Sequence, residues 1–243
     1  MEYEDNTQEP FLMQKDEEEN IERSIQETIR QGFIYKVFGI VTYQMILLFI
    51  MVYIGFISKT FREWLLTSVT MAIITMLISL TCLFAPLFKP SIFKHVPTNY
   101  ILLTVFTLSY SWWIAAYTVS FTQSSVLFAL FLTVIMVLSL TIYAFVTKKD
   151  FSSMGAFLCT ALSMLIVISL IQIFVRIPLL YLIELYGGLI IFCIYLIYDV
   201  QLIVGKGSNK FAEDDYILAA LNLYLDIIGI FVRILAIFGT KEN

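Results

Sequence analysis

Three carboxylates, those of Glu184, Asp199 and Asp226, lie inside long apolar stretches of the sequence. A charge inside a lipid bilayer is costly, so an ionisable residue in a membrane-spanning segment marks a functional site by default. Oxygen ligands suit a hard cation such as calcium. The three acids therefore predict a cation route through a membrane, with Asp199 and Asp226 as candidate calcium ligands.

The segment 215–238, which contains Asp226, has a polar stripe. At about 100° per residue its small and polar side chains share one side of a helix, and Ile, Leu and Phe cover the rest. The stripe consists of Asp215, Ala219, Asn222, Asp226, Gly229 and Arg233. Such a stripe faces other helices or water rather than lipid, so Asn222 joins the expected ion pathway. Arg233 lies nearer the end of the segment, where we expect its long side chain to extend to the headgroups.

Helix geometry places the three acids at different depths. Glu184 and Asp199 are fifteen positions apart, which separates them by about 60° around a helix and by roughly 22 Å along its axis. Helix rise from the 205–212 loop offsets Asp199 from Asp226 by roughly 10 Å. The acids are thus expected to be spaced through the bilayer.

Each acid also has a structural interpretation. A buried Asp that is protonated or hydrogen-bonded can hold two helices together without any ion. The candidate partners are Tyr195, Tyr198, Tyr224 and Asn222. Three acids together favour the ion route, because contacts between helices do not need charge.

The sequence lacks the residues that the common types of hydrolytic site require. The one His, His95, lies in a polar connection, which disfavours zinc hydrolases with several His ligands. Neither a Gly-x-Ser-x-Gly elbow nor a His-Glu-x-x-His pair occurs. Cys82, Cys159 and Cys193 lie inside apolar runs, so we expect small core residues rather than disulfides. We therefore expect neither enzyme activity nor a cofactor.

Membrane-spanning helices must position the acids. The sequence is 60% hydrophobic and 14% charged, whereas soluble domains are about half apolar and a quarter charged. Roughly 20 helical residues cross a bilayer. Seven apolar runs have that length: about 34–57, 65–88, 99–119, 124–146, 153–175, 179–204 and 215–238. Because the connections between them are short, we predict an all-α polytopic membrane protein without a globular insert.

Lysine and arginine positions predict the orientation. With a cytosolic N-terminus, eight Lys and Arg residues near the span ends fall on the cytosolic side and four on the opposite side. Because positive residues favour the cytosolic side, we predict a cytosolic N-terminus and a C-terminus across the membrane. Residues 1–28, acidic and poor in apolar residues, are predicted to be a disordered cytosolic tail, followed by the membrane domain 29–243. No nucleic-acid partner is indicated.

Four segments resemble the transmembrane Bax-inhibitor-motif family, in particular its Lifeguard and Golgi anti-apoptotic branch. They are Ile29–Leu48, Thr147–Leu158, Tyr195–Gly205 and Glu213–Phe231. The last two are specific, because YLIYDVQLIVG and EDDYILAALNLYLDIIGIF each place an Asp inside an apolar helix. The resemblance covers roughly residues 29–238.

The resemblance implies seven helices with the last one central, a passive calcium leak from the endoplasmic reticulum or Golgi, and suppression of cell death. In that family the Asp of the YD-x-Q motif and the Asp of the LYLD motif form a proton-sensitive pair that gates the pore; here these are Asp199 and Asp226. Some members carry an Arg on the second helix that holds the pair, whereas 65–88 has no charged residue. Gly229 stands where many relatives have Asn.

Together, the residues and the resemblance predict a pH-sensitive calcium leak channel of an intracellular membrane with an anti-apoptotic role. Two adjacent carboxylates in a low dielectric cannot both stay ionised cheaply, and they titrate as a unit. Two alternatives stay open: a non-conducting scaffold that regulates other channels or cell-death proteins, and a proton-coupled cation exchanger. The expected partners are the lipid bilayer, calcium ions, and cell-death regulators or calcium-release channels.

Overall fold

The computed structural model describes residues 8–242, and the side chains of residues 15–242 apart from 87 and 90. In this part of the chain, seven helices are long and apolar enough to cross a membrane. The prediction of an all-α polytopic protein with seven spans is therefore confirmed.

Five of the seven spans follow the predicted apolar runs closely. The helices are α1 (Gln8–Ile57), α2 (Lys59–Thr67), α3 (Val69–Phe88), α4 (Thr98–Thr118), α5 (Gln123–Val146), α6 (Gly155–Phe174), α7 (Pro178–Leu182), α8 (Gly188–Val204) and α9 (Tyr216–Phe238). The sixth span consists of α7, one π-helical turn at Ile183–Gly187, and α8. Pro178 begins it at the first helical position, where a missing N–H costs no hydrogen bond.

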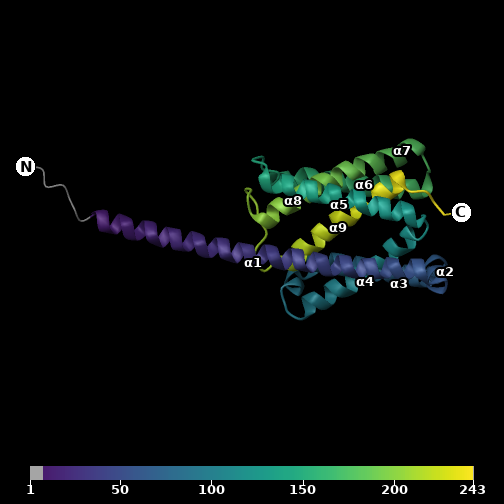
Figure 1. The fold of residues 1–243 in the computed structure, drawn as a ribbon, viewed down its shortest axis with the longest axis horizontal. Coiled ribbons are helices and arrows are strands. Elements are labelled where there is room, and N and C mark those ends of the chain that lie inside the picture. Colours follow the sequence, from purple (N-terminus) through teal and green to yellow (C-terminus); the bar gives the residue numbers. More distant parts are fainter. Residues whose placement is uncertain (1–7, 243) are drawn as a thin grey trace, which may run out of the picture.

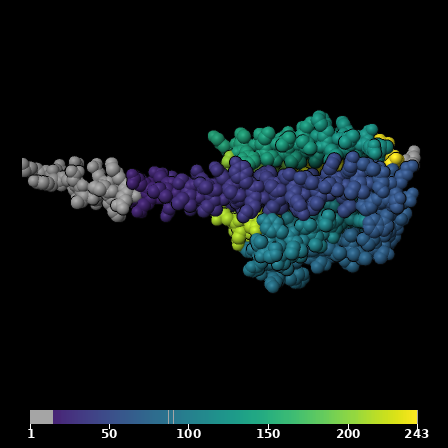
Figure 2. Space-filling view, turned by 60° about the horizontal axis from the view of Figure 1, so that its bottom comes forward, coloured from purple at the N-terminus to yellow at the C-terminus, as the bar shows by residue number. Residues whose placement is uncertain are grey.

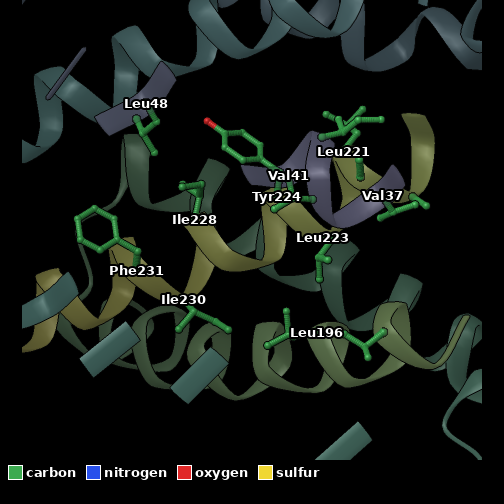
Figure 3. Close-up of a cluster of buried hydrophobic side chains, with 14 of the residues drawn as sticks. Val37, Val41, Leu48, Leu196, Leu221, Leu223, Tyr224, Ile228, Ile230 and Phe231 are labelled. Carbon is green, nitrogen blue, oxygen red and sulfur yellow. The ribbon is translucent and has the colours of Figure 1, made fainter. Parts of the chain in front are cut away.

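The last helix, α9, lies at the centre of the bundle. It packs against α1, α4, α5 and α8, whereas α3 packs on α4 and α6 packs on α8. Figure 1 shows α9 running obliquely between the group of α1, α3 and α4 and the group of α5, α6 and α8. The core forms around this helix, and Tyr224 and Ile228 of α9 belong to the same buried cluster as Val41 of α1 (Figure 3). The central position predicted for the last helix is confirmed.

The second span begins later than predicted. We expected it from residue 65, but residues 59–67 form the separate short helix α2. Ser58 caps this helix by accepting a hydrogen bond from the backbone N–H of Phe61 at 3.3 Å. Leu65 is its buried residue and packs in a small cluster with Trp112 of α4. The segment is amphipathic, so it covers the end of the bundle instead of extending α3.

The first helix continues well before the membrane. Residues 8–28, which we expected to be disordered, are helical as part of α1. This stretch is rich in Glu, Gln, Lys and Arg, which favour helix, and Arg23 lies 3.7 Å from Glu19 one turn earlier. Figures 1 and 2 show α1 projecting beyond the bundle and lying along its surface. The division into a tail at 1–28 and a membrane domain at 29–243 stays a prediction.

Side-chain and backbone contacts tie the loops together at each end of the bundle. At the end where α1 projects, Arg30 donates to the carbonyl oxygens of Phe211, at 2.8 Å, and of Leu202. α8 ends there at Gly205, whose φ of 76° lies in the left-handed region that favours glycine. At the opposite end, Arg62 pairs with Glu242. The loops at both ends of the bundle are therefore held in place by contacts with distant parts of the chain.

Candidate functional site

Asp199 on α8 and Asp226 on α9 form a buried carboxyl pair. Only 3% of Asp199 and 4% of Asp226 is exposed, and the two carboxyl groups lie next to each other. No Lys or Arg among the described residues forms an ion pair with either of them. The 10 Å offset expected from helix rise is therefore wrong. The rise acts along the axis of α9, which runs obliquely across the bundle (Figure 1), so it projects to a shorter separation.

Two buried carboxyl groups that lie side by side favour sharing a proton. An ionised carboxylate only accepts hydrogen bonds, so two carboxyl groups can bond to each other only when one is protonated. The Oδ2 atom of Asp226 is buried, and no donor in the described part of the chain reaches it. The arrangement thus suits one shared proton, and no ion pair with a Lys or Arg of the described residues neutralises a second negative charge.

A cavity of about 590 Å³ adjoins the pair. Its walls come from α4, α6, α8 and α9. The polar residues that line it are Tyr110, Ser169, Tyr195, Asp199, Asn222, Asp226 and Arg233. Asn222 therefore shares the cavity with both acids, and four members of the stripe on 215–238 line this cavity: Asn222, Asp226, Gly229 and Arg233. Size and polarity allow the cavity to hold several waters or a hydrated ion.

Glu184 lies apart from the pair. It belongs to the π-helical turn that precedes α8, a type of distortion frequent at functional sites. Its Oε1 accepts a hydrogen bond from Ser169 Oγ at 2.6 Å. Glu184 lines a second cavity of about 170 Å³. The structure thus brings Asp199, Asp226 and Asn222 together and places Glu184 in a separate chamber.

Arg233 connects the two chambers, because it lines both cavities. We expected its side chain to extend to the headgroups. Instead, its guanidinium stacks over the Phe192 ring at 4.5 Å and donates to the carbonyl oxygen of Gly229 at 3.1 Å. Gly229 makes this possible, since a Cβ there would lie 2.6 Å from Cε1 of Phe192. The polar stripe contained the signal for Arg233, but its nearness to the span end suggested snorkelling.

The described residues contain no group of three or more His, Cys, Asp or Glu that could hold a metal ion. Calcium takes six to eight oxygens, so Asp199 and Asp226 could supply only part of its coordination shell.

The cysteines differ in their burial. Cys82 is buried, but Cys159 is exposed on α6. A core position was therefore the wrong expectation for Cys159.

These features define a class: multi-pass helical membrane proteins with a carboxyl pair buried between their last two helices. The chain belongs to the Bax inhibitor family, because the sequence profile described as "Inhibitor of apoptosis-promoting Bax1" matches residues 30–243. The resemblance of the four segments is thereby confirmed.

Three relatives illustrate the similarity. Protein LIFEGUARD 4 of Arabidopsis thaliana is 36% identical over 222 residues, which cover 88% of this chain and 87% of the relative. Bax inhibitor 1 of Schizosaccharomyces pombe is 32% identical over 218 residues, covering 89% and 79%. The Golgi anti-apoptotic protein of Vaccinia virus (strain Lister) is 34% identical over 215 residues, covering 88% of each chain. The matches extend over nearly the whole membrane region.

Proposed function

We propose that this protein is a calcium-permeable leak channel of an intracellular membrane, gated by protonation of Asp199 and Asp226, and that it suppresses cell death. The observation that carries the proposal is the pair of buried, adjacent carboxyl groups between α8 and α9, next to a cavity that seven polar side chains help to line. The names of the relatives support the anti-apoptotic role.

Gating follows from the charge of the pair. With one shared proton, the two carboxyl groups hold α8 and α9 together. Loss of that proton places two negative charges side by side in a low dielectric, where they repel strongly. Separation of the helices then relieves the repulsion and leaves carboxylates that attract a cation.

Other titratable or charged groups also face the pair. Tyr195 and Cys193 lie on α8, Tyr110 lies on α4, and Arg233 lies on α9. Tyr and Cys side chains titrate well above neutral pH in water, and Arg stays charged. Asp199 and Asp226 are thus the groups we assign to a pH response near neutrality.

The two chambers supply the ion path in this proposal. A cation passes the carboxyl pair and Asn222 in the larger cavity, then Arg233, then Glu184 in the smaller one. The guanidinium of Arg233 lines both cavities and repels a cation, so in this proposal Arg233 closes the path in the described conformation. Opening requires Arg233 to leave the junction. Waters complete the coordination of calcium on the way, because two carboxylates supply too few oxygens.

Location and orientation belong to the same proposal. The name of the vaccinia relative favours the Golgi, and the endoplasmic reticulum is the other candidate membrane. The N-terminus is cytosolic by the distribution of Lys and Arg. Interaction with cell-death regulators or calcium-release channels would then occur on the cytosolic side, where α1 projects.

The test is calcium flux into dye-loaded liposomes that contain the purified protein, measured across pH. Wild-type flux should change with pH near neutrality, by up to about tenfold per pH unit, the limit for one titrating proton. Asp226→Asn and Asp199→Asn keep the shape of the pair but remove a titrating group, so each should lose most of the pH response. The double variant should add little, because the two residues act as a unit.

Glu184→Gln is the matched control. It removes a carboxylate from the second chamber, so it should lower the flux and leave its pH profile intact. Unchanged pH profiles in both single Asp variants would refute the gating role. Absence of flux from wild-type protein would favour the scaffold, and a flux that needs a proton gradient would favour the exchanger.

A further inference from the structure

A basic pocket, apart from the two carboxylate chambers, lies where the loops after α5 and α8 meet. It has a volume of about 450 Å³. Its lining residues are Val146, Thr147, Lys148, Lys149, Asp150, Gln201, Lys206 and Gly207. Figure 1 shows these loops at the end of the bundle from which α1 projects. Three lysines against one aspartate give the lining a net positive charge.

Asp150 is the one acidic residue of this pocket, and both of its carboxylate oxygens already accept hydrogen bonds from the surrounding loops. Asp150 Oδ1 accepts hydrogen bonds from the backbone N–H and the hydroxyl of Ser152, at 2.9 and 2.6 Å. Oδ2 accepts from the backbone N–H and the hydroxyl of Ser208, at 3.1 and 2.7 Å. None of the ion pairs between described residues involves Lys148, Lys149 or Lys206. The positive charges of the pocket therefore remain available to a ligand.

The pocket is also held in shape. Gln201 of α8 accepts from the backbone N–H of Phe151 at 2.7 Å and donates to the carbonyl oxygen of Lys149 at 2.9 Å. Lys206 donates to the carbonyl oxygen of Phe145, in the last turn of α5. These bonds fix the walls before any ligand arrives, which lowers the entropic cost of binding.

The position of the pocket indicates the source of its ligand. Val146, the last residue of α5, is exposed and apolar, and the charged Lys148 and Lys149 follow immediately. This change from apolar to basic residues marks the boundary between hydrocarbon and headgroups. Lysine ammonium groups bind phosphate as point charges, and basic pockets between membrane helices accept anionic headgroups.

We propose that the pocket formed by Lys148, Lys149 and Lys206 binds the phosphate-bearing headgroup of a membrane lipid. A phosphomonoester headgroup fits best, because it carries more charge than a phosphodiester and three lysines line the pocket. Gln201 lies two residues after Asp199 on α8, so a bound headgroup would also stabilise the position of the α8 end. An effect of this stabilisation on ion flux would rest on the proposed channel function, whereas the binding site does not depend on it.

The binding test uses the full chain in phosphatidylcholine nanodiscs that contain a small fraction of phosphatidylinositol 4-phosphate. Native mass spectrometry measures the lipid retained by the protein. Lys148→Gln/Lys149→Gln removes two charges from groups whose side chains make no hydrogen bond or ion pair within the described chain. We expect this double variant to bind about 25-fold more weakly, from about fivefold per lysine near an anionic headgroup.

The matched control is Lys89→Gln/Lys210→Gln, which removes the same charge from exposed lysines at the same end of the bundle but outside the pocket. Its binding should stay within twofold of wild type. An equal loss in both double variants would mean diffuse surface attraction and would overturn the proposal, as would equal retention of phosphatidylserine. Displacement of the lipid by equimolar inositol 1,4-bisphosphate would assign the pocket to a soluble phosphate compound instead of a lipid.

Calcium flux in liposomes with and without phosphatidylinositol 4-phosphate then tests the link to α8. A lipid effect on flux that disappears in Lys148→Gln/Lys149→Gln, but persists in the control, supports the link. Specific binding without an effect on flux would remove the link and leave the site. Absence of flux in every lipid mixture would contradict the channel function and leave the binding result standing.

Discussion

At the scale of single residues, Asp150 and Asp226 show two ways of accommodating a carboxyl group. Asp150, outside the membrane, accepts four hydrogen bonds from Ser152 and Ser208. Hydrogen bonds from Ser152 and Ser208 lower the pKa of Asp150 to about 2. Asp226 is buried and contacts another acid instead of donors. The first arrangement stabilises an anion, and the second stabilises a shared proton.

The low pKa of Asp150 predicts a pH dependence of stability. Because the pKa is lower in the folded than in the unfolded protein, the ionised group stabilises the fold above pH 4, and this contribution is lost as the pH falls toward about 2. Asp150→Ala should therefore lower the Tm of the purified protein at pH 7. The difference from wild type should shrink below pH 4 and vanish near pH 2.

Asp16→Ala is a control for this experiment, since it removes the same charge from an exposed part of α1 beyond the bundle. Its Tm should match wild type at every pH. If the Asp150→Ala difference were the same at pH 2 and pH 7, the hydrogen bonds to the ionised carboxylate would not be its cause.

At the scale of secondary-structure elements, the last helix, α9, positions the residues of the candidate site. One side of this helix carries Asn222, Asp226 and Arg233 toward the cavities, and its other sides carry apolar side chains into the core (Figure 3). A spanning helix surrounded by protein can hold polar groups that lipid would reject. The central position of α9 is therefore what permits an acid in mid-membrane.

This position predicts the chemical accessibility of α9. Single-Cys variants Ala219→Cys, Asn222→Cys and Asp226→Cys, in a background without the three native cysteines, should react poorly with a lipid-soluble thiol probe. Protein covers these positions on the lipid side, although Asn222→Cys borders the cavity and can react with a small water-soluble probe. Mass spectrometry of the labelled protein gives the extent of reaction.

Met164→Cys on α6 provides the comparison, because Met164 is 63% exposed on the outside of the bundle. It should react readily with the lipid-soluble probe. Reaction of the α9 positions to the same extent as Met164→Cys would contradict a central α9.

At the scale of the whole molecule, seven spans place the two chain ends on opposite sides of the membrane. Figure 1 shows the α1 projection and the C-terminus at opposite ends of the bundle. Each end is fastened by contacts between distant segments. Lys94 pairs with Asp214 at 2.8 Å on the side where α1 projects, and Thr122 bonds to Thr240 at 3.0 Å on the other side.

We predict a cytosolic N-terminus and a lumenal C-terminus in cells. The bias of Lys and Arg, eight against four, provides the physical reason. Glycosylation acceptors added at each end report the side, and only the C-terminal acceptor should be modified. Modification at the N-terminus alone would reverse the orientation, and modification at neither end would make one span re-entrant.

The sequence by itself determined the seven spans, because span length follows from hydrophobic thickness and every apolar run ends at polar residues. It also determined the polar side of α9, because helical periodicity fixes which residues share a face. Asp199 and Asp226 could be selected because an ionisable residue in an apolar run is visible without a structure, and Asn222 because it shares the polar stripe with Asp226. The limits of such patterns appear at span ends. Helix propensity continued α1 into residues 8–28, and the amphipathic α2 replaced the expected start of the second span.

Only the tertiary structure decided which residues meet. Contact between Asp199 and Asp226 depends on how α9 crosses α8, and the crossing angle arises from side-chain packing that periodicity does not encode. Arg233 was assigned to the headgroups because of its place in the sequence, but Gly229 leaves room for Phe192, and that ring holds the guanidinium between the two cavities. The basic pocket likewise needs two loops more than fifty residues apart to close around three lysines, and their contact exists only in the folded chain.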